Sequence, residues 1–147
     1  MSGTKPSAKP GASLAAIQAF IAEQFPQTRC EVIAVGDGAA SVRHAVGPAE
    51  LRPGGTVSGP VLMTAADVAL YIAILGKIGI KPLTVTTSLT INFLRKPSAE
   101  RAVLAECTLL KTGRGLVVGE VALYSEGLPE MVAHAVGTYS VPPDDRS

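Results

Sequence analysis

A run of apolar residues at positions 61–75 constrains the fold of this chain more than any other feature. Nearly every position in it is apolar or small, so it predicts a helix that is buried on almost all sides. Pro60 suits the first helical position, where its missing N–H costs nothing, and Ser58 or Gly59 can serve as the N-cap. The run is short for a membrane span and contains the charged Asp67, so we expect no membrane crossing.

Asp67 is the one charged residue in this run. A carboxylate in the interior of an apolar helix is costly to desolvate and adds nothing to helix propensity. It can be a structural aspartate that bonds to a neighbouring threonine or backbone group. It can also be a catalytic carboxylate in an otherwise apolar pocket. We favour the catalytic interpretation.

A helix that is apolar on all sides must be buried by other elements, and the rest of the chain is predicted to be mainly strands that can bury it. A first helix is predicted at 14–25, where apolar positions keep a helical spacing and Pro26 follows. Asp37-Gly38 is a typical hairpin turn, and residues 47–57 are expected to form a loop. Period-two patterns and turn residues predict strands at 31–35, 40–46, 83–94, 103–111, 116–124 and 131–139. The pattern indicates an α+β fold in which a curled antiparallel sheet wraps around one long helix.

The predicted domain organisation is simple. Residues 13–140 are expected to form one domain, flanked by a flexible tail at 1–12 and a second tail at 141–147. The length of 147 residues suits one domain with a sizeable core.

The segment 83–94 is the clearest predicted strand, because a period of two gives it one face that is apolar except for Thr87 and a second face that is polar. The alternation assigns Thr84, Thr86, Ser88, Thr90 and Asn92 to one face. That face has hydroxyls and an amide but no charge, whereas a freely solvated strand normally includes Lys or Glu. We therefore expect it to face a partner subunit or a ligand.

Composition excludes several classes of function. A net charge of +1, with three Phe, three Tyr and no Trp, argues against nucleic acid and against an anionic membrane surface. Cys30 and Cys107 match no metal or redox spacing, and no cluster of His, Cys and carboxylates predicts a metal site. Reduced thiols and the absence of an apolar signal core in residues 1–12 predict a cytoplasmic protein.

Several motifs together resemble a known family. Ser58-Gly59-Pro60 opens the central helix, and Asp67 follows nine residues after Ser58. The long strand ends in Asn-Phe-Leu-Arg-Lys-Pro at residues 92–97, and the last strand closes with Ala-Val-Gly-Thr-Tyr at 135–139. Over residues 47–139 the chain resembles the hotdog-fold acyl-CoA thioesterases, specifically the PaaI-like branch of the 4-hydroxybenzoyl-CoA thioesterase superfamily. The resemblance implies a hotdog fold and hydrolysis of an acyl-CoA thioester to free acid and coenzyme A.

The chain departs from the family pattern at three positions. A family His-Gly-Gly loop precedes the helix, and here Ser58 replaces the histidine while Pro60 replaces the second glycine. An asparagine that often lies six residues before the histidine aligns with Arg52. Gly59 and Asp67 are retained.

The resemblance also implies roles for individual residues. Gly59 would use its backbone N–H at the helix N-terminus to polarise the thioester carbonyl. Asp67 would act as general base on water or as nucleophile, approaching the thioester from a partner subunit's helix. Ser58 would either orient water or only cap the helix. Thr86 aligns with a Ser or Thr that helps to position the water from the partner subunit.

Coenzyme A is part of the expected substrate, so no separate cofactor is predicted. The phosphates of its nucleotide need cations, and Arg95, Lys96, Lys111 and Arg114 occur at predicted strand ends and at a hairpin tip. Each of these four side chains can equally be ordinary solvated charge. The expected assembly is a homodimer or homotetramer, because the family builds each site from two subunits.

Two other functions compete with hydrolysis. Ser58 and Arg52, which replace active-site groups of the family, suggest a non-hydrolytic acyl-CoA binding module on the same fold. A hotdog dehydratase is a third alternative, but such enzymes use a histidine that the loop lacks. Asp67 favours the hydrolase, since a pure binding protein gains nothing from a buried carboxylate.

Overall fold

The computed structural model describes residues 11–143, so residues 1–10 and 144–147 of the two predicted tails lie outside the described part. At both ends, contacts with the body extend slightly beyond residues 13–140. The amide of Ala12 donates to the carbonyl of Leu75 at 3.1 Å, and the amide of Val141 donates to the carbonyl of Gly115 at 2.9 Å.

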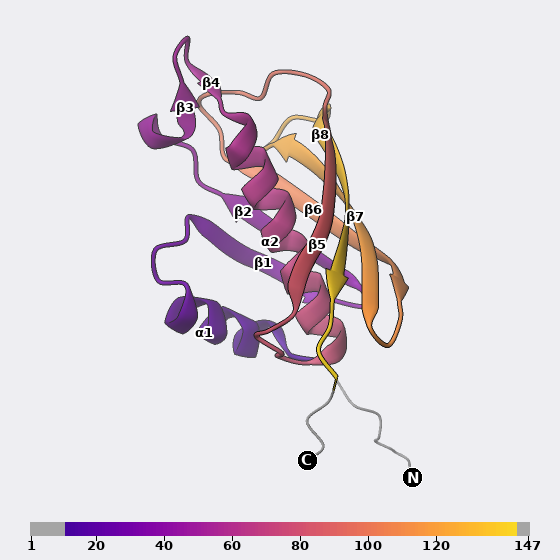
Figure 1. Cartoon of the computed structure of the whole chain (residues 1–147). Coiled ribbons are helices and arrows are strands. Elements are labelled where there is room, and N and C mark those ends of the chain that lie inside the picture. Colours follow the sequence, from indigo (N-terminus) through magenta and orange to yellow (C-terminus); the bar gives the residue numbers. More distant parts are fainter. Residues whose placement is uncertain (1–10, 144–147) are drawn as a thin grey trace.

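The structure has the predicted α+β architecture, with one long helix enclosed by an antiparallel sheet (Figure 1). The sheet order is β1-β2-β6-β7-β8-β5, so β1 and β5 form its two edges. A separate hairpin pairs β3 with β4. The elements in chain order are α1 (Leu14–Gln24), β1 (Cys30–Gly36), β2 (Ala39–His44), the 3₁₀ turn η1 (Pro48–Glu50), β3 (Leu51–Arg52), β4 (Thr56–Val57), α2 (Gly59–Ile78), β5 (Val85–Phe93), β6 (Val103–Thr112), β7 (Leu116–Ser125) and β8 (Met131–Ser140). This is the hotdog fold.

Helix α2 lies against the concave side of the sheet and supplies much of the core (Figure 1). Two glycines let the sheet approach it closely. A Cβ on Gly137 would lie 2.5 Å from Leu70 Cδ1, and a Cβ on Gly119 would lie 2.8 Å from Leu70 Cδ2. By length and composition alone α2 is apolar enough to cross a membrane, with a mean hydropathy of 1.8. Burial in the core of the domain accounts for that composition.

The hairpin of β1 and β2 forms at the predicted turn. Asp37 has φ 55° and Gly38 has φ 74°, as a two-residue turn of type I′ requires at both central positions. Gly36 and Ala39 then face each other as the last pair of the ladder.

The predicted loop at 47–57 contains more structure than expected, because it holds η1 and the short β3–β4 hairpin. Its anchor is Glu50, which is buried. The carboxylate of Glu50 accepts from Arg29 Nε at 3.0 Å and from the amide of Gly47 at 2.7 Å. Burial opposes the charge, but these donors prevail and hold the pKa of Glu50 below its ordinary value. The carbonyl of Glu50 also accepts from the amide of Ser58, which fixes the approach to α2.

The prediction of strict alternation along 83–94 was wrong. The strand begins at Val85, and its pairing with β8 shifts register between Thr86 and Ser88. This β-bulge changes which side chains share a face. Thr86 therefore lies on the helix side, with Leu89 and Ile91, rather than on the same face as Ser88.

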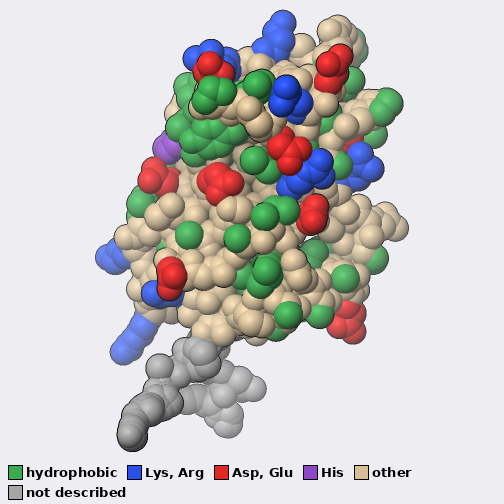
Figure 2. Space-filling view, turned by 180° about the vertical axis from the view of Figure 1, so that it is seen from behind, with side chains coloured by type: hydrophobic (Ala, Val, Ile, Leu, Met, Phe, Trp, Pro, Cys, Tyr) green, Lys and Arg blue, Asp and Glu red, His purple; other side chains and the backbone are tan. Residues whose placement is uncertain are grey.

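The face of the molecule opposite to the view of Figure 1 carries mixed charge. Figure 2 shows acidic and basic side chains interspersed over it, with scattered hydrophobic groups between them. Such a surface is typical of a solvated protein exterior and differs from the basic stripe of a nucleic-acid-binding face.

Candidate active site

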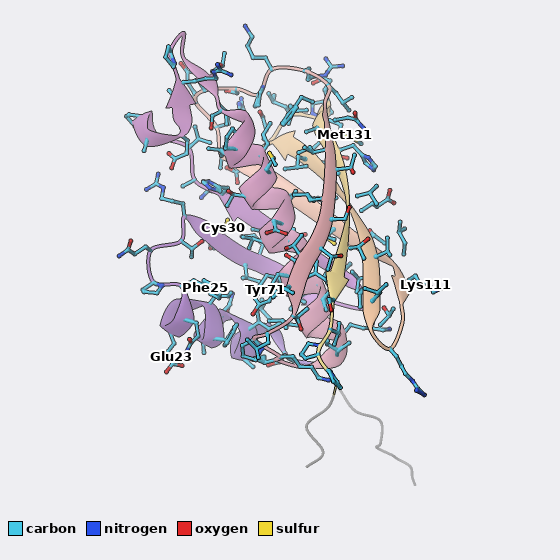
Figure 3. The ribbon with its side chains drawn as sticks, viewed as in Figure 1. Glu23, Phe25, Cys30, Tyr71, Lys111 and Met131 are labelled. Carbon is cyan, nitrogen blue, oxygen red and sulfur yellow. The ribbon has the colours of Figure 1, made fainter. Side chains whose placement is uncertain are left out.

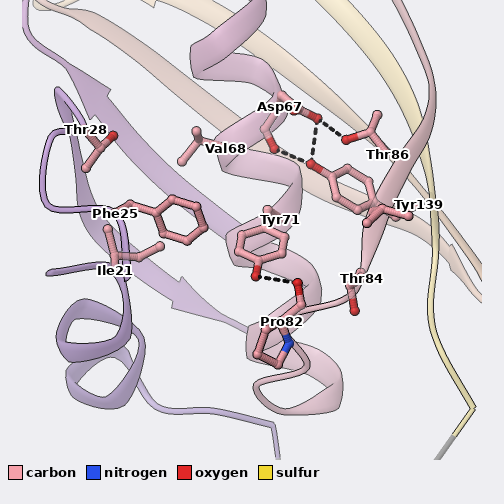
Figure 4. A pocket seen from close by; sticks show the side chains of 11 residues that line it. Ile21, Phe25, Thr28, Asp67, Val68, Tyr71, Pro82, Thr84, Thr86 and Tyr139 are labelled. Atoms are coloured by element: carbon pink, nitrogen blue, oxygen red, sulfur yellow. Dashed lines mark hydrogen bonds between the residues drawn. The ribbon is translucent and has the colours of Figure 1, made fainter. Parts of the chain in front are cut away.

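Asp67 lies on the third turn of α2, and two hydroxyl groups hold its carboxylate. The phenol of Tyr139 lies 2.6 Å from Asp67 Oδ1, and the hydroxyl of Thr86 donates to the same oxygen at 2.8 Å (Figure 4). Among the described residues, no hydrogen bond is made to the other carboxylate oxygen, Oδ2. One oxygen is thus anchored while the other is left for chemistry.

The sheet brings these two hydroxyls together. Thr86 on β5 and Tyr139 on β8 are direct partners in the antiparallel ladder, so their side chains point to the same face. The bulge that follows Thr86 is what allows it to face α2 while Leu89 and Ile91 still cover the helix further along.

Tyr139 is suited to remain a hydrogen-bond donor. Burial and the bond to Asp67 raise the pKa of Tyr139 well above its ordinary value, so the phenol stays protonated. Its oxygen also lies 2.9 Å from the backbone carbonyl of Asp67. A phenol has one proton, and the shorter contact to the carboxylate identifies that oxygen as its stronger partner.

A cavity of about 440 Å³ opens beside Asp67. Its volume is in the range of small-molecule pockets, and its walls are mainly apolar and aromatic. Figure 4 shows that side chains from α1, α2, β5 and β8 meet there. The lining residues are Ile21, Phe25, Thr28, Asp67, Val68, Tyr71, Pro82, Thr84, Val85, Thr86 and Tyr139.

Ser58 and Gly59 lie at the N-terminus of α2. Ser58 is the N-cap, with φ −73° and ψ 151°, and its Oγ accepts from the amide of Val61 at 3.4 Å. The ring of Phe93 packs against Gly59, where a Cβ would lie 3.3 Å from Phe93 Cζ. The close ring explains why a glycine suits this position.

A second cavity, of about 410 Å³, lies at this end of the helix, and it brings together three cations. Gly59 and Phe93 line it with Arg52, Arg95 and Lys96. Arg95 and Lys96, predicted as phosphate ligands, are thus adjacent to the helix N-terminus. Sequence reasoning noted Arg52 only as a departure from the family pattern, and the structure adds it to this group.

Lys111 and Arg114 occupy a different place. They lie at the β6–β7 hairpin and line neither of these two cavities. Figure 3 shows Lys111 at the β6–β7 end of the molecule, away from Tyr71 and Phe25. Of the four predicted cations, only Arg95 and Lys96 line one of these two cavities, and they do so together with the predicted site residue Gly59 of the same chain.

Asp67 and Gly59 are also separated within one chain. Eight residues of helix correspond to about 12 Å at 1.5 Å per residue, too far for both to contact one thioester group. Thr86 was expected to act from the partner subunit, but the structure places it against Asp67 of its own chain. The three cations and Gly59 at the N-terminus of α2 and the carboxylate of Asp67 near the middle of the helix are therefore separate within one chain, and we call them the two half-sites.

Tyr139 and Tyr71 are the site residues that sequence reasoning missed. Tyr139 lies 72 residues from Asp67, and no local pattern connects the two. The motif that ends in Tyr139 contributed to the family resemblance, yet it gave no sign that the tyrosine side chain reaches α2. Tyr71 follows Asp67 by four residues on the same helix face, and that spacing could have identified it.

Neither cysteine is positioned for chemistry. Cys30 and Cys107 are both buried free thiols, and burial raises the pKa of each, that of Cys107 to about 12. In the part of the chain that the structure describes, no group of three or more His, Cys, Asp or Glu side chains could hold a metal ion.

Comparisons with known proteins identify the family of this chain. Residues 54–132 match the thioesterase superfamily. A candidate thioesterase from Silicibacter sp. TM1040 is 39% identical, with 92% of this chain and 95% of that chain covered and a TM-score of 0.84. The PaaI protein of the phenylacetic acid degradation operon of E. coli is 22% identical, with 84% and 89% covered and a TM-score of 0.70.

A hypothetical thioesterase from Streptococcus pneumoniae TIGR4, solved with coenzyme A, is 20% identical. The match covers 89% of this chain and 100% of that chain, with a TM-score of 0.75, and at this identity it shows the fold alone. The comparison with curated proteins gave no match. The family match and the hotdog architecture agree, and the chain belongs to the thioesterase superfamily.

Proposed function

We propose that this protein hydrolyses acyl-CoA thioesters. The observation that carries the proposal is the arrangement of Asp67, whose Oδ1 is held by two hydroxyls and which lines a mainly apolar cavity of about 440 Å³. An apolar cavity next to a poised carboxylate suits an acyl group whose carbonyl must be attacked.

Two routes are compatible with this carboxylate. As general base, Oδ2 removes a proton from water while the water oxygen adds to the carbonyl carbon, and the C–S bond then breaks to release the coenzyme A thiolate, which takes up a proton. As nucleophile, Oδ2 itself adds to the carbonyl carbon, the thiolate leaves, and water hydrolyses the resulting anhydride. Single turnover in ¹⁸O-labelled water distinguishes them, because only the anhydride route can place ¹⁸O in Asp67.

The carbonyl oxygen needs a donor, and the N–H of Gly59 at the positive end of α2 suits that role. Because Gly59 lies about 12 Å along the helix from Asp67 of its own chain, we propose that the two half-sites meet across a homodimer. The edge strand β5 offers a surface for this contact, with Val85 and Phe93 both about half exposed. A homotetramer would be a pair of such dimers.

The cationic end of the site suits the nucleotide of coenzyme A. Arg95 and Lys96 lie beside Gly59, where phosphates would meet both the side-chain charges and the helix end. The fold-related protein from Streptococcus pneumoniae was solved with coenzyme A, which supports this ligand class. Lys111 and Arg114 are proposed as contacts only if a neighbouring subunit brings the β6–β7 hairpin near.

A thiol-release assay over a panel of acyl-CoA substrates tests the activity. Both cysteines of the protein are buried and have raised pKa values, so they should contribute little background to a thiol reagent. Wild-type protein should release coenzyme A, and Asp67→Asn should fold normally and lose about a hundredfold or more in turnover. Unchanged turnover in Asp67→Asn would refute the assignment.

The replacement of the family histidine by Ser58 favours one second candidate, a non-hydrolytic acyl-CoA binding module. That function predicts tight binding of acyl-CoA by calorimetry with no release of thiol from any member of the panel.

A further inference from the structure

The first helix, α1, forms one wall of the cavity beside Asp67. Ile21 lies within the helix and Phe25 is its C-terminal cap residue, with its amide donating to the carbonyl of Ile21 at 2.8 Å. Figure 4 shows Phe25 on the α1 side of the cavity and Asp67 on the other side, with Val68 and Tyr71 between them. An acyl group that starts at Asp67 would therefore extend towards Phe25.

A third cavity, of about 410 Å³, lies on the other side of this wall. Ile21, Phe25 and Thr28 line both this space and the cavity beside Asp67. The remaining residues of the third cavity are Gln18, Ala22, Pro26, Cys30, Glu31 and Val32. The shared residues thus form a partition between two spaces of similar volume.

Phe25 is the largest side chain in this partition, and 45% of its surface is exposed. Its ring makes edge contacts with Phe20 and Tyr71, at centroid distances of 6.1 and 6.2 Å. Tyr71 is held more firmly, because its hydroxyl donates to the carbonyl of Pro82 at 3.3 Å. The ring of Phe25 is therefore the part of the wall that a substitution can change with least effect on the core.

We propose that Phe25 is a specificity-determining residue that ends the acyl pocket and limits the length of the apolar acyl group. The inference rests on the proposed acyl-CoA hydrolysis and adds to it the feature that selects among substrates. With Phe25 in place, acyl groups that fit the cavity beside Asp67 are accepted. Removal of the ring joins that cavity to the space near Cys30 and admits longer chains.

The test compares three variants over saturated acyl-CoA substrates from four to sixteen carbons, a series that brackets the range of an apolar pocket of this size. We expect Phe25→Ala to favour long acyl chains: kcat/KM for long chains, divided by kcat/KM for short chains, should rise about tenfold or more. Each methylene group that is newly buried in an apolar pocket changes kcat/KM by about that factor. Phe25→Trp should shift the preference in the opposite direction, towards shorter chains.

Phe20→Ala is the matched control. Phe20 lies on the same helix and its ring is 6.4 Å from that of Tyr71, but it lines neither cavity. Phe20→Ala should lower the melting temperature without changing how kcat/KM depends on the length of the acyl chain. An unchanged profile in both Phe25 variants, or an equal change in Phe20→Ala, would overturn the proposal.

Binding of non-hydrolysable thioether analogues, measured by calorimetry, separates failure of this inference from failure of the proposed function. If wild-type protein hydrolyses none of the panel, the proposed hydrolysis fails, while the affinity profile of the analogues still tests Phe25. A shift of that profile towards longer analogues in Phe25→Ala supports the partition, and an unshifted profile contradicts it.

Discussion

The phenol of Tyr139 lies 2.6 Å from Oδ1 of Asp67 and 2.9 Å from the backbone carbonyl of the same residue. One side chain on β8 thus contacts both the functional group and the main chain of a residue on α2. Because Thr86 donates to the same Oδ1, the rotation of the carboxylate is restricted from two directions. The two hydrogen bonds to Oδ1 therefore fix the position of Oδ2 more narrowly than a freely rotating aspartate side chain would.

Tyr139→Phe tests this relationship. The variant keeps the ring in the core and removes only the donor to a charged group, so the free energy of unfolding should fall by about 1.5–3 kcal/mol. A carboxylate that can rotate is less well aimed, and kcat should fall on the order of 10- to 100-fold with little change in KM. Steady-state kinetics and thermal melts measure the two effects.

Tyr71→Phe is the control for this prediction. It also removes a phenolic hydroxyl from the wall of the same cavity, but that hydroxyl donates to the carbonyl of Pro82 and not to Asp67. It should leave kcat within about twofold of wild type, well under the loss expected when a charge-assisted bond is removed. A comparable loss in both variants would mean that cavity polarity, rather than the orientation of Asp67, sets the rate.

Thr86→Val removes the second donor to Asp67 Oδ1 while keeping the shape of the side chain. A hydrogen bond to a charged group contributes about 1.5–3 kcal/mol, so turnover should fall about tenfold or more. Thr87→Val is the neighbouring control, since Thr87 donates to the carbonyl of Thr138 and not to Asp67. The double variant with Tyr139→Phe should show less than the sum of the two losses, because both groups act on one oxygen.

Much of the fold follows from local pattern. The apolar run that becomes α2, the Asp37-Gly38 turn and the alternating segments that become β6, β7 and β8 each carry their own signal. Asp67 could be identified because a charge inside such a run is conspicuous. The resemblance to a thioesterase family rests in part on the motif spacing around the same residue.

The features that complete the site depend on pairing between distant segments. The register shift after Thr86 is determined by how β5 meets β8, and the polar run Thr86-Thr87-Ser88 does not by itself locate the bulge. Tyr139 reaches Asp67 only because β8 lies between β7 and β5 in the sheet. The two-residue strands β3 and β4 are too short to produce a periodic pattern, which is why that segment was expected to be a loop.

The stability of the fold should depend on pH in the alkaline range. Burial raises the pKa of Cys107 from 9.0 to about 12, so the folded state holds this proton more tightly than the unfolded state does. The resulting stabilisation is complete below pH 9 and is lost as the pH rises towards 12. Over that window one such group contributes a slope of about 1.4 kcal/mol per pH unit.

Urea unfolding between pH 8 and 11 measures this slope in wild type and in Cys107→Ala. The variant should show a shallower decline, while Tyr139 and Cys30, whose pKa values are also raised by burial, still contribute. Parallel pH profiles for the two proteins would show that the thiol of Cys107 does not titrate in the folded state as expected.

The assembly prediction follows from the separation of the half-sites. Asp67 and Gly59 of one chain cannot reach one thioester, so activity should require at least a dimer. Light scattering at micromolar concentration should give a mass of two or four chains. Replacing Val85 on the exposed edge strand with Lys should dissociate the dimer and abolish turnover together, since like charges would then face each other across the contact. A stable monomer that retains full activity would contradict the proposal of a shared site.

Ser58 provides the last prediction, because its position separates a structural role from a chemical one. Its Oγ accepts from the amide of Val61 at 3.4 Å, as an N-cap side chain does, and Gly59 and Asp67 already supply the donor and the carboxylate that hydrolysis needs. Ser58→Ala should therefore lower the free energy of unfolding by about 1 kcal/mol and leave turnover nearly unchanged. Ser58→Asp, which keeps an N-cap acceptor, should restore the melting temperature. A large fall in kcat in Ser58→Ala without a fall in melting temperature would instead show that this hydroxyl orients water in place of the family histidine.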